Sequence, residues 1–228
     1  MTLKHAIGCA LGITAIGAAG SAVATEDLSY TYLQLDYIVR DIDVFDDDED
    51  FIEDFDDGNG LALRGSFEVT DNFFVFGEYS EVESDVEYAS DNVFPIPADQ
   101  DVTQLMAGIG TGIEIAQRTD FVGRLGYTDI DYGDFDIGGT TDDFDLSDLG
   151  DDSSDGFFVD AGVRSQLHDR LDGSIGVRYV DIEDVDNTSL IGNLKFELTD
   201  AWSINLMVDA GDELSTYALG ARWSGGDD

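Results

Sequence analysis

Cysteine, histidine, proline and basic residues are all scarce in this sequence. Its 228 residues include one cysteine, two histidines, two prolines and ten Lys or Arg, against 51 Asp or Glu. One cysteine cannot form a disulfide within the chain. The formal net charge of −41 excludes nucleic acid as a partner, because phosphate recognition needs clustered Lys and Arg. It also excludes docking to an anionic membrane surface through a basic patch.

The chain nevertheless has enough apolar material for a folded domain. Hydrophobic residues make up 43% of it and aromatic residues 11%, so it is not a disordered acidic tail. The length fits a single domain.

The N-terminal segment has the pattern of a secretory signal peptide. Basic Lys4 and His5 precede an apolar run over 6–20, and Ala22-Val23-Ala24 forms a cleavage site. We therefore expect 1–24 to be a signal peptide and 25–228 to be one exported domain. The single cysteine, Cys9, lies in the signal peptide, so thiolate chemistry is excluded from the exported domain.

The exported domain alternates apolar and polar residues with the period of β-strands, and helical periodicity is absent. Short polar turns alternate with longer connections, which is typical of an outer-membrane barrel whose short turns face the periplasm. Pro95 and Pro97 fall in one of the long connections, where they do not interrupt a hydrogen-bond ladder. The expected strands are 29–40, 60–69, 73–82, 102–115, 119–130, 156–167, 171–182, 188–198, 202–210 and 215–223. The expected short turns are 70–72, 116–118, 168–170 and 199–201, and the other connections are 41–59, 83–101, 131–155, 183–187 and 211–214.

One face of each expected strand is apolar and the other carries charges and glycines. A soluble barrel or sandwich would turn the apolar face inward, whereas a membrane barrel turns it towards lipid. The signal peptide and the aromatic residues near strand ends favour the membrane barrel. We therefore expect an all-β, closed antiparallel up-and-down transmembrane β-barrel of ten strands, with long acidic extracellular loops and short periplasmic turns. The expected girdle aromatics are Tyr37, Phe67, Phe73, Tyr79, Phe121, Tyr127, Phe157, Tyr179, Phe196, Trp202, Tyr217 and Trp223.

The polar strand faces predict a lumen filled by ion pairs. Ten strands enclose a narrow interior, and buried charges there need partners, because desolvation without pairing costs several kcal/mol per ion. Glycines on the same face leave room for long side chains. A path for protons or small ions through this network is the alternative. The predicted network consists of Asp36, Arg40, Arg64, Glu68, Glu78, Arg124, Asp160, Arg164, Arg178, Lys195, Glu197, Asp209 and Arg222.

Four stretches resemble a ten-stranded proteobacterial outer-membrane β-barrel family. They are SYTYLQLDYIVRD (29–41), LRGSFEVTDNFFVFGEYS (63–80), MAGIGTGI (106–113) and DAGVRSQL (160–167). The resemblance spans essentially the exported domain and implies a barrel in the bacterial outer membrane, with no catalytic residues to transfer. The last expected strand, which ends at Trp223, is similar to the aromatic-ended terminal strand that the barrel assembly machinery reads.

Known barrel enzymes need residues that this sequence lacks. A barrel protease or phospholipase needs histidine in its site, but the exported domain has only His168, in an expected periplasmic turn. No glycine-rich phosphate loop precedes a helix. We therefore expect no enzyme and no cofactor.

The five loop-side connections carry most of the acidity. They hold 11, 6, 10, 3 and 2 acids in chain order, or 32 of the 51, and no Lys or Arg. Carboxylate oxygens suit Ca²⁺ or Mg²⁺, and a dedicated metal site is the alternative to a solvated, ion-screened surface. The sequence predicts a monomer with a structural or interaction role that contacts cations, lipopolysaccharide or a surface partner; a narrow cation-selective channel or small-solute porin is the alternative. The candidate metal ligands are Asp46, Asp47, Asp48, Asp50, Asp54 and Asp56.

Overall fold

The computed structural model describes residues 28–42, 52–55, 58–90, 93–137, 153–182, 185–211 and 214–225. Nearly all of these residues lie in antiparallel strands. Within them, no helix has the length and hydropathy needed to cross a membrane. The strands are β1 (Tyr32–Ile42), β2 (Ile52–Phe55), β3 (Gly58–Thr70), β4 (Phe73–Ser90), β5 (Val93–Ala116), β6 (Thr119–Ile137), β7 (Ser153–His168), β8 (Leu171–Ile182), β9 (Val185–Glu197), β10 (Trp202–Gly211) and β11 (Leu214–Ser224).

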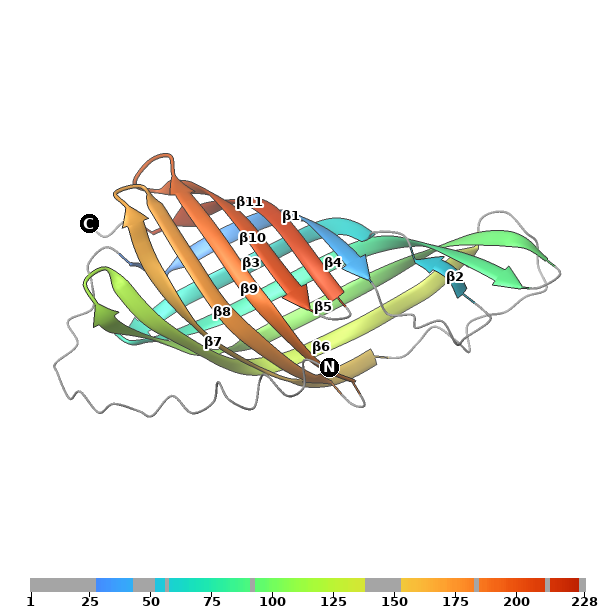
Figure 1. Ribbon diagram of the computed structural model, residues 1–228, viewed down its shortest axis with the longest axis horizontal. Helices are drawn as coiled ribbons and strands as arrows, with labels where there is room; N and C mark the ends of the chain where they lie inside the picture. The colour runs from blue at the N-terminus through green and yellow to red at the C-terminus, as the bar shows by residue number, and fades with distance from the viewer. Residues whose placement is uncertain are drawn as a thin grey trace, which may run out of the picture.

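Ten of these strands close into a barrel (Figure 1). Each pairs with its neighbour in sequence, and β1 pairs with β11, which closes the barrel without a free edge. The short strand β2 is not a wall strand, since it pairs only with the far part of β4. The prediction of a closed ten-stranded antiparallel barrel is confirmed.

The two ends of the barrel differ in their connections. At one end, here the turn end, the strands are joined by 71–72, 117–118, 169–170 and 198–201. Arg118 in the second of these turns has a φ of 60°, the left-handed conformation that tight turns often need. At the other end, here the loop end, the connections between β1 and β3 and between β6 and β7 are long, whereas 91–92, 183–184 and 212–213 are as short as the turns. The expected alternation of short turns with longer connections is therefore present only in part.

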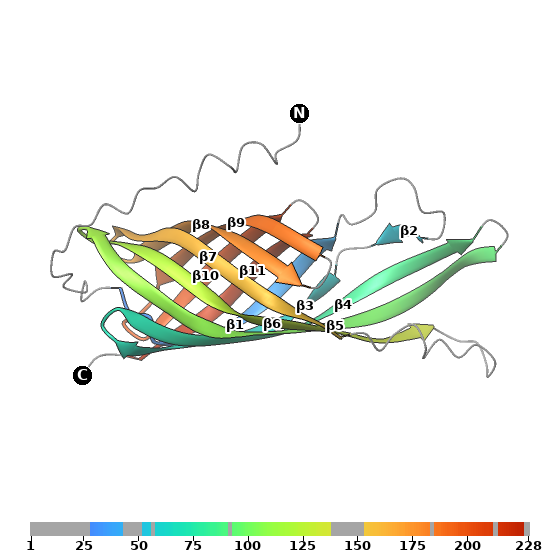
Figure 2. The same cartoon turned by 90° about the horizontal axis from the view of Figure 1, so that it is seen from below.

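At the loop end β4, β5 and β6 extend well beyond the other strands (Figures 1 and 2). The pairing of β4 with β3 stops at Glu83, but its pairing with β5 continues to Ser90 and Val93. The prediction that 83–101 is a connection was therefore wrong, because the alternating pattern continues through it as a hairpin. The expected connection 131–155 is likewise shorter, since β6 continues to Ile137 and β7 begins at Ser153.

The two prolines lie in this extension and not between strands. Pro95 and Pro97 belong to β5, before Ala98, where its pairing with β6 begins. At these positions β5 has β4 on one side only. Residues two apart in a strand point their backbone groups to the same edge, so both missing N–H groups can face the open side. A strand tolerates proline at such an edge.

The wall of the barrel is apolar outside and polar inside. Along β1, Leu33, Leu35 and Tyr37 are about half exposed, at 51–55%, whereas the alternating residues Gln34 and Asp36 are at most 2% exposed. A soluble protein would bury the first set and expose the second. Such an inverted arrangement is stable where lipid surrounds the outer face.

Candidate functional site: the barrel lumen

The centre of the lumen holds an ion-pair cluster around Asp160. This carboxylate on β7 accepts hydrogen bonds from Arg124 on β6 and from Arg178 on β8, the latter through Nε at 2.9 Å and Nη2 at 3.2 Å. Arg178 also pairs with Asp209 at 2.8 Å. The strand register places Arg124, Asp160 and Arg178 directly opposite one another on neighbouring strands. Two guanidinium groups therefore share one carboxylate that is only 6% exposed.

A second cluster lies on the opposite wall, on β1, β3, β4 and β11. Arg64 pairs with the fully buried Asp36 and, at 2.9 Å, with Glu78. The Gln34 amide donates to both Asp36 oxygens at 2.8 and 2.9 Å, and its own oxygen accepts from Arg222 Nε at 2.6 Å. The amide of Gln34 therefore links Arg222 indirectly to the Asp36 carboxylate.

A third cluster lies nearer the turn end. Asp172 on β8 accepts from Arg164 at 3.0 Å and from Lys195 at 2.7 Å, and Lys195 also reaches Glu197 at 2.9 Å. Asp172 is 3% exposed, so its charge depends on these two bases. The alternation of acids and bases across three strands keeps the cluster neutral.

The structure thus joins most of the residues predicted to form the lumen network, but not all. Arg40 donates to Gln104 at 3.2 Å, and the Glu68 backbone N–H donates to the Thr31 hydroxyl oxygen at 3.1 Å. Arg222 binds the uncharged Gln34. Asp172 was not predicted, although it belongs to the inward face of an expected strand.

Residues 28–31, here the stopper, lie before β1 and fill the mouth of the lumen at the turn end. Leu28 and Tyr30 are only 4% and 8% exposed. The Tyr30 hydroxyl donates to Asp120 at 2.8 Å, and Arg164 donates to the Ser29 carbonyl at 3.0 Å. The Tyr30 ring stacks on Phe74, with centroids 4.7 Å apart and planes within 5°. The stopper is therefore held by aromatic, hydrogen-bonding and cationic contacts to different strands.

Aromatic rings in the lumen were missed by the sequence argument, which placed aromatics on the outer face. Phe74, Phe76 and Phe158 point inward and continue the row begun by Tyr30, with centroid distances of 6.2 and 5.8 Å. Arg124 lies 5.3 Å above the Phe76 ring and Arg178 lies 5.7 Å above that of Phe158. A local signal exists, because Phe73-Phe74 and Phe157-Phe158 are doublets, and in a strand one residue of a doublet must face inward.

Glycines opposite these side chains create the necessary room. A Cβ on Gly110 would lie 2.2 Å from the Phe74 ring, and one on Gly220 would lie 2.0 Å from the Asp36 carboxylate and 2.3 Å from the Leu35 carbonyl. Such distances are far below van der Waals contact, so these glycines are required by close packing.

We expect Gly220→Ala to lower the free energy of unfolding by about 1–3 kcal/mol, the usual cost of overpacking. Gly192→Ala is the matched control, because a Cβ there meets nothing within 4 Å. Urea unfolding of both variants in detergent, followed by far-UV circular dichroism, measures the difference. Equal midpoints for the two variants would contradict the packing argument.

An apolar layer lies on the loop-end side of the ion pairs, on the adjacent strands β4, β3, β1, β11 and β10. Ile38, Ala62, Val82 and Ala218 are each at most 2% exposed and pack with Met207. Ile38 follows Asp36 along the inward face of β1, and Arg40 follows Ile38. The layer therefore lies between the charged clusters and the loop end.

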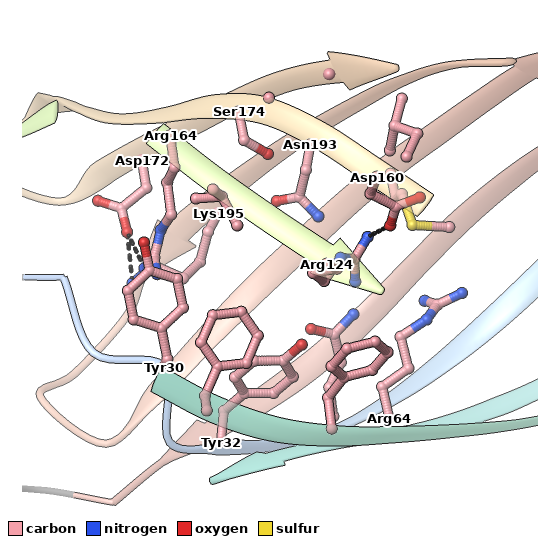
Figure 3. A pocket seen from close by; sticks show the side chains of 18 of the residues that line it. Tyr30, Tyr32, Arg64, Arg124, Asp160, Arg164, Asp172, Ser174, Asn193 and Lys195 are labelled. Atoms are coloured by element: carbon pink, nitrogen blue, oxygen red, sulfur yellow. Dashed lines mark hydrogen bonds and ion pairs between the residues drawn. The ribbon is translucent and has the colours of Figure 1, made fainter. Parts of the chain in front are cut away.

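A cavity of about 160 Å³ lies between the stopper and the central clusters (Figure 3). Tyr30, Arg164 and Asp172 lie on one side of it, Arg124 and Asp160 on another, and Ser174 and Asn193 opposite Tyr32. At roughly 30 Å³ per molecule, it has room for about five waters.

The candidate metal ligands cannot be placed. Asp46, Asp47, Asp48, Asp50 and Asp56 lie outside the described residues, and Asp54 lies in β2, of which only the backbone is described. Within the described part of the chain, no group of three or more carboxylate or histidine residues is arranged to bind a metal ion. The signal peptide, 1–24, also lies outside the described residues.

Comparison with known proteins agrees with the architecture. Residues 9–197 match the family model described as the outer membrane protein beta-barrel domain. No curated protein matches the chain.

Several solved structures are similar. The translocator domain of the autotransporter NalP from Neisseria meningitidis aligns with a TM-score of 0.50 and 8% identity over 88% of this chain and 91% of that one. OprG from Pseudomonas aeruginosa aligns with a TM-score of 0.49 and 12% identity, over 86% and 97%. Ail from Yersinia pestis, in complex with the heparin analogue sucrose octasulfate, aligns with a TM-score of 0.42 and 16% identity, over 85% and 96%. At these identities the likeness concerns the fold alone.

Proposed function

This chain belongs to the outer membrane protein beta-barrel family of the bacterial outer membrane, and we propose that it acts there as a closed barrel with a structural or surface-interaction role. The observation that carries this proposal is the obstructed lumen. From the turn end to the loop end, the lumen contains the stopper, the three ion-pair clusters and the apolar layer. A hydrated ion would have to displace the stopper, break charge pairs and pass the apolar layer, and breaking buried charge pairs is costly.

The surface role follows from the sidedness of the barrel. In barrels of this class the short turns face the periplasm, so the extended hairpin of β4 and β5 projects from the cell. The five loop-side segments that the sequence predicted as connections, some of which are strand, carry 32 of the 51 acids and no base. We propose that Ca²⁺ or Mg²⁺ bridges these acids to the anionic groups of neighbouring lipopolysaccharide, since hard divalent ions prefer carboxylate and phosphate oxygens. The protein would reach this position by export through residues 1–24, insertion by the barrel assembly machinery, and folding as a monomer.

A catalytic role has no support in the described lumen. Its acids Asp36, Asp160 and Asp172 are each paired with a base, and His168 is exposed at the turn end of β7, away from the clusters. A general base would need both a free basic group and a substrate path. We therefore propose that the protein is not an enzyme.

Planar-bilayer recording tests the closed barrel. We expect refolded protein whose heat-modifiable gel mobility shows a folded barrel to give no reproducible unitary current steps at neutral pH. A filled lumen explains this result, because the stopper and the paired charges obstruct the path of a hydrated ion. Regular steps with cation selectivity would instead support the narrow channel, the candidate that the cavity of about 160 Å³ favours.

A further inference from the structure

We propose that the lumen cavity is a binding site for one small oxyanion, such as sulfate, phosphate or a carboxylate. The proposal concerns the interior of the barrel and does not depend on the surface role. It rests on how the charges are oriented around the cavity. The bases that line it are Arg64, Arg124, Arg164, Arg178, Lys195 and Arg222, whereas the acids that line it are Glu78, Asp160 and Asp172.

The ion-pair clusters are neutral as a whole, but their bases face the cavity more than their acids do. Asp36, Asp209 and Glu197 pair with Arg64, Arg178 and Lys195, and none of these three acids lines the cavity. Six bases and three acids therefore line the cavity, so the charge of its lining is positive. A fixed array of donors around a cavity gives a positive local potential even where the net charge is zero.

Arg222 has donors to spare. Of the bases that line the cavity in the described part of the chain, it alone forms no ion pair. Its Nε donates to Gln34, and its guanidinium carbon lies 3.8 Å from the centroid of the Tyr32 ring. A guanidinium carries five N–H donors, so most of those on Arg222 have no protein acceptor. Arg222 is partly buried, so its remaining N–H groups are left for water or for an anion, and an anion would form the stronger, charge-assisted hydrogen bonds.

Neutral donors complete the site on the far wall. Ser174 on β8 and Asn193 on β9 line the same cavity and lie in register with each other. Figure 3 shows both side chains across the cavity from Tyr32. A hydroxyl and an amide N–H₂ suit an oxyanion, which accepts several hydrogen bonds at once. A metal cation would instead meet six bases, so the chemistry favours an anion.

Direct binding is the test, with labelled sulfate as the probe. The full exported domain is refolded in an uncharged detergent with radiolabelled sulfate, so that the cavity fills during assembly. It is then brought to equilibrium by dialysis at roughly 0.3 M NaCl, where the Debye length is only about 6 Å and long-range fields are screened. A protein of net charge −41 repels anions from its surface. We therefore expect saturable retention of about one sulfate per chain, which only an interior site explains.

The variants locate the site. Arg222→Gln should weaken sulfate binding by roughly ten- to a hundredfold, the range for one charged hydrogen-bond partner. Arg170→Gln removes the same charge from an exposed turn and should leave binding unchanged. Ser174→Val leaves every ion pair intact and should weaken sulfate binding severalfold. It therefore tests the site even if Arg222→Gln does not refold. Absence of saturable sulfate in the wild-type chain, or equal binding by Arg222→Gln and Arg170→Gln, would overturn the proposal.

Discussion

Asp160→Asn should lower the free energy of unfolding by about 3–5 kcal/mol, the cost of breaking a buried ion pair from one side. Asp160 is the carboxylate shared by Arg124 and Arg178. Arg178 keeps Asp209 at 2.8 Å after the change, but Arg124 has no second ion pair within the described residues. The loss should therefore fall mainly on Arg124, whose side chain, 25% exposed, is left in the lumen without a counter-charge.

The matched control is Asp169→Asn, which removes the same charge at the surface. Asp169 pairs with Arg118 at 3.5 Å, and its side chain is 82% exposed. Such a pair contributes at most about 1 kcal/mol. Urea unfolding in detergent, followed by far-UV circular dichroism, compares the two variants. In addition, Asp160→Asn combined with Arg124→Leu should recover part of the loss, because the unpaired charge is removed. Equal midpoints for the two single variants would show that the cluster does not stabilise the barrel.

Much of the fold could be predicted from the sequence because strands of a membrane barrel follow a period of two. Residues such as Leu33 and Leu35 face outward and Gln34 and Asp36 inward, as the alternation requires. The pattern alone could not give strand ends. Residues 83–90 are acidic yet continue β4, because a hairpin outside lipid needs no apolar face. Composition therefore indicated a loop where the backbone forms a ladder.

The lumen was less predictable than the wall, since partners depend on register and on side-chain length. Alternation identifies Arg178 as inward, but not that it faces Asp160 across β7 and β8. The expected strand 29–40 includes Tyr30, and its alternation puts Tyr30 on the inward face of Gln34 and Asp36. However, β1 begins only at Tyr32, and alternation does not predict that the residues before it turn across the mouth of the lumen. The position of Tyr30 depends on Gly112, where a Cβ would lie 2.6 Å from the Tyr30 ring. Such a fit between distant segments is a property of the closed barrel and not of a local pattern.

Removal of the stopper side chain should expose the cavity to the turn end. Tyr30→Ala loses the stacking on Phe74, the hydrogen bond to Asp120 and the cation–π contact with Arg164 at 5.1 Å. Truncation of a buried aromatic costs about 3–5 kcal/mol. If most of that free energy holds the stopper in place, its open population rises by roughly two orders of magnitude or more. The apolar layer remains, so the expected result is access to the cavity and not a conducting pore.

Thiol labelling measures this access without interference from other cysteines, because the one native cysteine, Cys9, precedes residue 25. Ser174→Cys places a thiol in the cavity wall, and a small cationic thiol reagent should modify it slowly in the otherwise unchanged domain of residues 25–228. Labelling of a transiently opened site follows the population of its open form. When Tyr30→Ala is added, the labelling rate should therefore rise by roughly two orders of magnitude, as the open population of the stopper does. Tyr37→Ala provides the matched control, because Tyr37 lies on β1, which follows the stopper, and is 52% exposed on the outer face. If both tyrosine variants label at the same rate, the cavity is reached by another route, and residues 28–31 do not close the barrel.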